Sequence, residues 1–129
     1  MKVLGNILLV DDEPFIREVA REILESEGYA VTEAVDGEEG LTTFLEHAGK
    51  FQLVILDLVM PRMHGFQVMD RIRQVAPHTP ILLSSGYSSD TRPDVLVPSA
   101  TVGFLPKPYR GKTLLEHVAR LLGSGSPSR

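Results

Sequence analysis

The sequence predicts an α/β fold: a doubly wound sheet of five parallel strands with helices on both faces. Three observations support this prediction. Five short apolar segments have the length and composition of buried strands. Segments with apolar residues at helical spacing alternate with them, and strands that alternate with helices form parallel sheets. The length of 129 residues suits one domain, and the sequence contains no internal repeat.

The first half of the chain is predicted to form three strands, over 6–10, 29–34 and 51–56, and two helices, over 14–26 and 38–48. Pro14 suits a first helical turn and Gly28 a helix end. The strand over 51–56 is the most hydrophobic, so we expect it in the centre of the sheet. The more polar strand before it is expected near an edge. The side chains predicted to face the core from these helices are Phe15, Ile16, Val19, Ala20, Ile23, Leu24, Leu41, Phe44 and Leu45.

The second half is predicted to form strands over 80–83 and 101–105, and helices over 66–75 and 112–122. A fourth helix over 88–99 is expected to be short or irregular, because Pro93 and Pro98 fall within it and an interior proline costs about 3 kcal/mol. Right-handed crossovers would place the first and last helices on one face and the middle three on the other. Residues 1–122 would form the domain, and the Gly/Ser-rich residues 123–129 a flexible tail or linker stub.

Composition excludes several classes of function. The chain has no cysteine, which rules out disulfide scaffolds, thiolate zinc sites and cysteine nucleophiles. Thirteen basic and seventeen acidic residues give a net charge of −4 without a basic stripe, so we expect no direct binding of nucleic acid. No apolar run approaches the length of a membrane span, and no signal peptide is evident. These features predict a soluble, cytoplasmic protein.

Polar residues gather where the predicted strands end. Asp11 and Asp12 follow the first strand, Asp57 the third, Ser85 the fourth and Lys107 the fifth. Each residue alone has an ordinary structural interpretation as a turn former, helix cap or solvated side chain. In an open parallel sheet, however, all five would lie at the ligand-binding edge. Three carboxylates in one place repel unless a cation or Lys107 offsets them, and oxygen ligands without cysteine or histidine favour Mg²⁺.

Four motifs at these strand ends resemble the receiver domain of two-component response regulators. The motifs are Leu8-Leu9-Val10-Asp11-Asp12-Glu13, Asp57-Leu58-Val59-Met60-Pro61-Arg62-Met63-His64-Gly65, Ser84-Ser85-Gly86-Tyr87 and Phe104-Leu105-Pro106-Lys107-Pro108-Tyr109. Their order and spacing extend the resemblance over residues 5 to 122. The resemblance implies a flavodoxin-like sheet with the strand order 2-1-3-4-5.

The resemblance also implies a phosphoacceptor. Asp57 would accept a phosphoryl group from a histidine kinase or a histidine phosphotransfer domain. Asp11, Asp12 and Asp57, with the backbone carbonyl of Val59, would hold Mg²⁺. The domain would catalyse its own phosphorylation and dephosphorylation without turning over a small-molecule substrate.

The remaining motif residues would act in switching. Ser85 and Lys107 would bind the phosphoryl group from its two sides. Phe104 would turn inward when Ser85 moves, and so change the surface around the fifth strand for a downstream protein partner. Pro108 would follow a cis peptide bond that directs Lys107 into the site.

Several features depart from the common pattern of the family. Val59 is apolar where many members are polar, and it should impede the attacking water and slow self-dephosphorylation. Arg92 is the only basic residue in 88–99, so the dimer mode that uses a charged fourth helix is not supported, and we expect a monomer or weak dimer. The Ser-Ser-Gly-Tyr ending of the fourth strand resembles receivers of hybrid sensor kinases, although stand-alone receivers carry it too. All four histidines, His47, His64, His78 and His117, are interpreted as surface residues.

Three other functions fit the sequence less well. A magnesium-dependent phosphatase of the haloacid dehalogenase type needs an Asp-x-Asp pair after its first strand, and Asp57-Leu58-Val59 lacks the second carboxylate. A flavodoxin-like cofactor binder needs a Gly-rich phosphate loop, and Asp11-Asp12 would repel the phosphate there. A receiver that acts by protein contact alone would not need the full acidic set with Lys107.

Overall fold

The computed structural model describes residues 3–47, 49–86 and 101–123. Within them, five parallel strands form one sheet in the order β2-β1-β3-β4-β5, as predicted. The strands are β1 (Asn6–Val10), β2 (Ala30–Ala34), β3 (Leu53–Asp57), β4 (Ile81–Ser85) and β5 (Val102–Pro106). The helices are α1 (Pro14–Glu27), α2 (Gly37–Glu46), α3 (Gly65–Val75) and α5 (Gly111–Leu122). The fourth helix expected over 88–99 and most of the expected tail lie outside the described residues.

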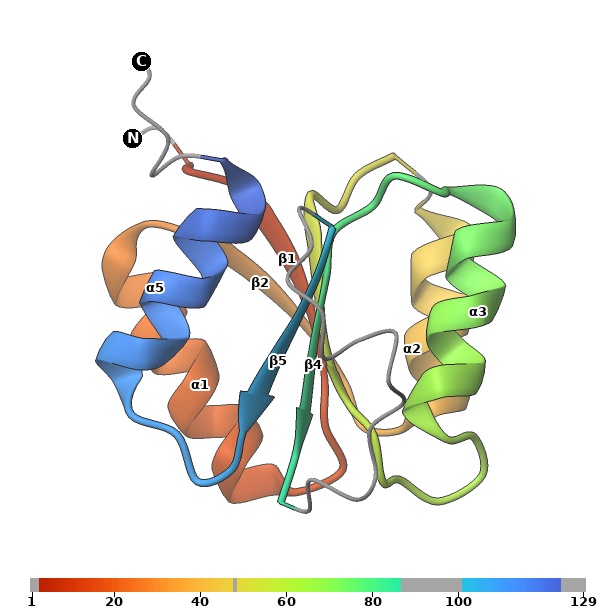
Figure 1. Ribbon diagram of the computed structural model, residues 1–129, viewed down its shortest axis with the longest axis horizontal. Coiled ribbons are helices and arrows are strands. Elements are labelled where there is room, and N and C mark those ends of the chain that lie inside the picture. Colours follow the sequence, from red (N-terminus) through yellow and green to blue (C-terminus); the bar gives the residue numbers. More distant parts are fainter. Residues whose placement is uncertain (1–2, 48, 87–100, 124–129) are drawn as a thin grey trace.

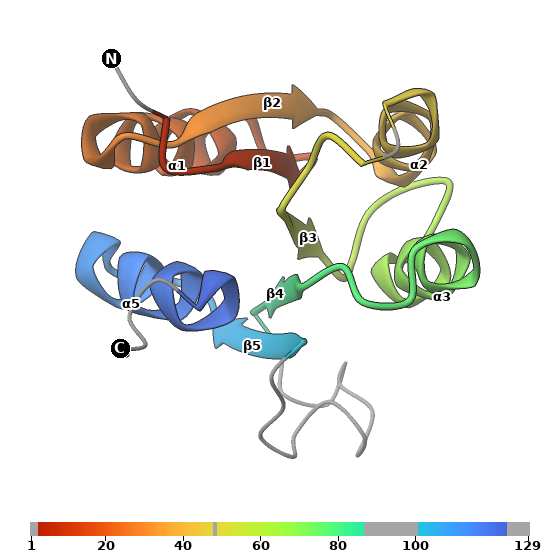
Figure 2. The same cartoon turned by 90° about the horizontal axis from the view of Figure 1, so that it is seen from above.

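The helices cover both faces of the sheet. Helices α1 and α5 lie on one face, and α2 and α3 lie on the other, as Figures 1 and 2 show. This is the arrangement that right-handed crossovers predict for these four helices. Because the five strands are parallel, their carboxyl ends meet at a single edge of the sheet, at the bottom of Figure 1. No helix among the described residues is long and apolar enough to cross a membrane.

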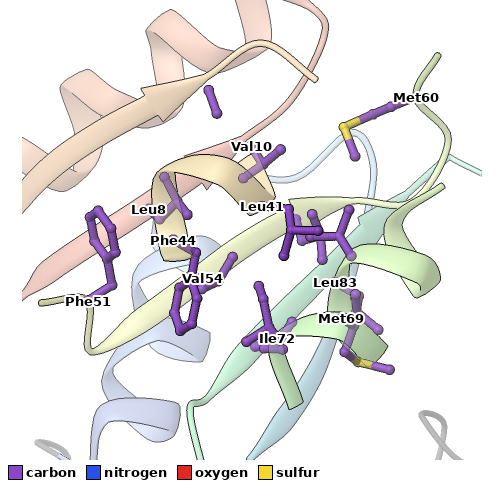
Figure 3. Packing of buried hydrophobic residues seen from close by; sticks show 14 of the residues in the cluster. Leu8, Val10, Leu41, Phe44, Phe51, Val54, Met60, Met69, Ile72 and Leu83 are labelled. Carbon is purple, nitrogen blue, oxygen red and sulfur yellow. The ribbon is translucent and has the colours of Figure 1, made fainter. Parts of the chain in front are cut away.

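Two apolar layers hold the helices on the sheet. Figure 3 shows the layer under α2 and α3, in which Val54 of the central strand lies near Phe44 and Ile72. The layer on the opposite face packs residues such as Ile55 against Leu24 and the inner side of α5. All five residues of β3 are buried, which fits its predicted central position. The sheet is thus a rigid base from which the strand ends present their side chains.

Local signals set the helix boundaries. Gly28 ends α1 with φ +113°, a left-handed conformation that glycine adopts without steric cost. The side chain of Asp36 caps α2 by accepting a hydrogen bond from the Glu39 amide at 2.8 Å. His64 caps α3, where its Nδ1 accepts from the Phe66 amide and its own amide donates to Gln67 Oε1.

Some burial predictions were wrong. Phe15, Val19 and Leu45 are exposed, with 73%, 38% and 42% of their surface accessible. On α1, the buried residues are Ala20 and Leu24. Phe15 and Val19 lie on a different stripe, about 140° round the helix on average. The histidine prediction was also wrong in part: His47 and His78 are exposed, but the capping residue His64 and His117 on α5 are half-buried.

Candidate functional site

The carboxyl ends of β1 and β3 bring three aspartates together. Asp11 follows β1 directly, and Asp57 is the last residue of β3. Both are buried, with 4% and 5% of their surface exposed, whereas Asp12 is half-buried. One carboxylate oxygen from each residue lies within 4.8 Å of the others. Because β1 and β3 are neighbours in the sheet, these strand ends concentrate negative charge at one point.

Lys107 supplies the opposing charge. Its Nζ lies 3.0 Å from Asp11 Oδ2, 2.9 Å from Glu13 Oε1 and 3.4 Å from Asp57 Oδ2. Only 12% of the lysine side chain is exposed. The residue follows β5 and precedes a cis peptide bond to Pro108, the geometry that the motif implied. The ammonium group therefore bridges carboxylates from both neighbouring strand ends.

Strand β4 anchors the segment that carries Lys107. The amide of Lys107 donates to the Ser85 carbonyl at 2.9 Å, and the Ser84 hydroxyl donates to the Leu105 carbonyl at 2.9 Å. Both serines are 2% exposed. No role was predicted for Ser84 from the sequence. A signal for such a role was present, because Ser84 adds a second hydroxyl beside Ser85 to an otherwise apolar strand. A buried hydroxyl requires a hydrogen-bond partner.

An open cleft of about 640 Å³ gives access to Asp12, Asp57, Ser85 and Lys107, whereas Asp11 is not part of its lining. Its lining consists of Asp12, Glu13, Ile16, Asp57, Val59, Ser85, Gly86, Lys107 and Pro108. Val59 is 51% exposed, so an apolar side chain lies at the mouth next to the aspartates. Phe104 is not part of the lining. It is half-buried on β5 and packs against the layer under α2 and α3.

Burial and mutual repulsion alter the acidity of the site. Burial, followed by the charge of Asp11, raises the pKa of Asp57 from its ordinary 3.8 to about 7. Burial also raises the pKa of Asp11. For Lys107, burial acts to lower the pKa, but the hydrogen bond to Glu13 and the charge of Asp11 outweigh it and raise the pKa above its usual value. Burial, with the charge of Asp11, raises the pKa of Tyr109 to about 12.

The raised pKa of Asp57 predicts how stability depends on pH. Folding favours the protonated carboxyl, so the metal-free protein should lose unfolding free energy as pH rises from about 4 through about 7. Asp57→Asn removes this titration. We expect the variant to unfold near the wild-type free energy at pH 4, and to be more stable by on the order of 2 to 4 kcal/mol at pH 8. Urea denaturation followed by circular dichroism in EDTA measures this, and a difference independent of pH would contradict it.

The chemistry of this donor set fits a hard divalent cation. The three aspartates provide closely spaced carboxylate oxygens, and no histidine or cysteine lies among them. Mg²⁺ is bound by one or two carboxylates while it keeps several waters, and the open cleft leaves space for these. A bound cation would also offset the repulsion that raises the pKa of Asp57.

Comparisons with known proteins identify the same family that the sequence motifs resemble. The sequence profile of the response regulator receiver domain matches residues 7–119. The sensor kinase CckA of Brucella abortus is 37% identical over 118 residues, which span 92% of this chain and 12% of that protein. The transcriptional regulatory protein YkoG of Bacillus subtilis is 36% identical over 121 residues, 92% of this chain and 51% of that protein. The chain thus spans about half of YkoG and a smaller share of CckA.

Solved structures agree with the sequence relatives. The receiver domain of the hybrid histidine kinase CckA is 39% identical, with a TM-score of 0.78, over 92% of this chain and 99% of that one. The response regulator TrrA of Thermotoga maritima, in complex with Mg²⁺ and BeF, is 38% identical, with a TM-score of 0.79 and the same coverage. The fold, the sequence profile and these relatives together show that the chain belongs to the response regulator receiver domains, the phosphoacceptor domains of two-component signalling.

Proposed function

We propose that Asp57 is the phosphoacceptor and that the surrounding residues bind the phosphoryl group. The observation that carries this proposal is the position of the Asp57 carboxylate. It lies at the end of the central strand and lines an open cleft, between two further aspartates and the ammonium group of Lys107. A nucleophile in this position is accessible to a donor, and the groups that neutralise phosphoryl charge are already in place.

The transfer step needs no general base. An Asp57 carboxylate oxygen attacks the phosphorus of a phosphohistidine, and the new O–P bond forms as the P–N bond breaks. The imidazole nitrogen keeps the electron pair and takes up a proton from solvent. Lys107 is within 3.4 Å of Asp57 and can donate to a phosphoryl oxygen. Ser85 lines the same cleft and can donate from the other side. The chain thus catalyses its own phosphorylation by positioning these donors.

We assign the metal site to Asp11, Asp12 and Asp57, with the backbone carbonyl of Val59 as a further ligand. The three carboxylates lie close enough together to share one cation. When bound, Mg²⁺ neutralises phosphoryl oxygens as charge develops in the transfer. The complex of TrrA with Mg²⁺ and BeF supports this assignment, since that protein is 38% identical to this chain.

Switching would pass from Ser85 to Phe104. In the sheet, Ser85 is paired with Pro106 and Leu83 with Phe104, so the two residues lie on adjacent strands only two positions apart. Movement of Ser85 toward the phosphoryl group would open space for the half-buried ring of Phe104. The surface of β5 at the edge of the sheet would then change, and a protein partner would read this change.

Receiver domains interact with histidine kinases and with downstream proteins, and the CheX–CheY complex of Borrelia burgdorferi is among the similar structures. We propose a histidine kinase or histidine phosphotransfer domain as the donor. Phe15 is exposed on the first turn of α1, and Ile16 beside it lines the cleft, so a donor helix could pack there. We further propose a cytoplasmic monomer or weak dimer that does not bind nucleic acid directly.

Incubation with Mg²⁺ and acetyl phosphate, followed by intact-mass measurement, tests the central proposal. We expect one phosphoryl adduct per chain, lost on treatment with hydroxylamine, which cleaves acyl phosphates. Phosphate monoesters should not be turned over in steady state, as a phosphatase of the haloacid dehalogenase type would do. Absence of an adduct on the wild type would exclude a phosphoacceptor.

The exposed side chain of Val59 predicts slow self-dephosphorylation. It lies at the mouth of the cleft, where it would exclude the water that attacks the acyl phosphate. Val59→Asn offers that water a hydrogen-bond partner and should shorten the half-life of the phosphorylated form several-fold. Decay of the adduct after removal of the donor, measured by intact mass, provides the test. An equal or longer half-life in the variant would disprove the role of Val59.

A further inference from the structure

The first turn of α1 carries a guanidinium group that contacts the backbone of the proposed metal site. Arg17 Nη1 donates to the main-chain carbonyl of Asp11 at 2.6 Å. Its Nε donates to Glu33 Oε1 on β2 at 2.9 Å. The arginine side chain is 14% exposed. The contact between Arg17 and Glu33 was not evident from the sequence, because the two residues are sixteen positions apart.

The Arg17 contact completes the restraints on Asp11. The Asp11 amide donates to the Ala34 carbonyl at 3.2 Å, and Oδ1 accepts from the Glu13 amide at 2.9 Å. Oδ2 pairs with Lys107 at 3.0 Å. The remaining polar group of Asp11 is its carbonyl, which accepts the hydrogen bond from Arg17. Asp11 is therefore held at its amide, its carbonyl and both carboxylate oxygens.

Arg17 also holds the turn from its other end. Its backbone amide donates to the Glu13 carbonyl at 3.0 Å, the first bond of α1. The turn Asp11-Asp12-Glu13 thus lies between two contacts of the same residue. Movement of this turn would displace Asp11 and Asp12 together relative to Asp57, which is fixed on a different strand. The spacing of the three carboxylates hence depends on a side chain outside the cleft lining.

We propose that Arg17, held in place by Glu33, is a positioning residue that sets the separation of Asp11 and Asp12 from Asp57 for the binding of Mg²⁺. The inference rests on the proposed function, because it assigns these three carboxylates to a metal. A charge-assisted hydrogen bond to a buried carbonyl is stronger than a neutral one. Partners that orient metal ligands without touching the metal typically contribute 10–100-fold to metal affinity.

Calorimetric titration with Mg²⁺ alone tests this inference on the full chain. Arg17→Ala should weaken Mg²⁺ binding by about tenfold, at the lower end of the range for orienting residues. The effect is expected to be small within that range because Arg17 acts through the backbone of a ligand residue. Phosphorylation by acetyl phosphate should then require a higher Mg²⁺ concentration for half-maximal rate, with the rate largely restored at saturating Mg²⁺. A purely structural role would lower stability without this shift.

Arg21→Ala is the matched control. Arg21 lies one turn further along α1, and its Nε pairs with the other Glu33 oxygen, Oε2, at 3.1 Å. We expect its Mg²⁺ affinity to match the wild type. Glu33→Ala should weaken binding less than Arg17→Ala does, and it should add little in the Arg17→Ala background, because Glu33 acts through Arg17.

A measurement without metal distinguishes loss of the Arg17 contact from loss of folding. In EDTA, amide hydrogen exchange at Glu13 should speed up in Arg17→Ala. Arg17→Lys keeps the charge but lacks the separate Nε and Nη1 donors that reach Glu33 and Asp11, so it should be intermediate. Unchanged Mg²⁺ affinity and exchange in both Arg17 variants, with a wild type that binds Mg²⁺, would overturn this inference alone. A wild type that binds no Mg²⁺ would overturn the metal assignment and this inference with it.

Discussion

Asp57→Asn is expected to abolish the phosphoryl adduct altogether. The amide has almost the same shape as the carboxylate, so the cleft should keep its form, but an amide oxygen is a far weaker nucleophile. Asp11 and Asp12 are the nearest alternative carboxylates. Asp11 is not part of the cleft lining, and both of its carboxylate oxygens already have partners in the Glu13 amide and Lys107. Intact-mass measurement after incubation with Mg²⁺ and acetyl phosphate reads out the loss directly.

The matched control for Asp57→Asn is Asp36→Asn. Asp36 carries the same functional group but caps α2 and is absent from the lining of the cleft. This control should form the adduct as the wild type does. An adduct that persists in Asp57→Asn would show that the acceptor has been assigned to the wrong residue.

Lys107→Ala is expected to have the second-largest effect, and it acts on stability as well as on chemistry. The ammonium group lies against Asp11 and Asp57, both at least 95% buried, so its removal leaves buried charge uncompensated. Loss of one partner of such a pair costs about 3 to 5 kcal/mol. We expect a loss of about 3 kcal/mol in the free energy of unfolding at pH 8 without metal, within that range. At pH 5 the loss should be smaller, because the pKa of Asp57, raised to about 7, keeps that carboxyl protonated and removes one of the buried charges.

The same variant should accept phosphoryl groups at least about tenfold more slowly at saturating Mg²⁺, because it lacks a donor to the phosphoryl oxygens. Lys112→Ala is the control, since Lys112 is an exposed lysine in the first turn of α5. It should change stability by less than about 0.5 kcal/mol. A Lys107→Ala variant as stable as this control at pH 8 would mean that the buried charges are balanced by another group.

Much of the fold was readable from local patterns. Short apolar runs marked most of the strands, β2 being the more polar exception, and the fully apolar run before Asp57 indicated the central position of β3. Glycine at 28 and proline at 14 marked the ends of α1 because their backbone preferences are strong in any context. The residues of the cleft were also predictable, since parallel strands place the residues that follow them at one edge.

Predictions failed where the answer depended on a partner from another element. Phe15 and Val19 have the spacing of a core stripe, yet the sheet contacts a different stripe, and only packing decides between the two. His64 was expected on the surface, but it is half-buried and caps α3 through its ring nitrogen. Ser84 shows the same limit, because its partner is a carbonyl on the neighbouring strand.

The sequence by itself determined the fold class, the strand order through its motifs, and the set of residues at the strand ends. The fold class and the strand-end residues follow from periodicity and chain order. The strand order came from the resemblance of the four motifs to receiver domains. The tertiary structure alone decided how the charges at that edge are balanced. Lys107 bridges Asp11 and Asp57, and Arg17 reaches from α1 to the Asp11 carbonyl while Glu33 on the edge strand holds it. Such contacts depend on distances between elements far apart in the chain, and only the packing of helices on the sheet sets those distances.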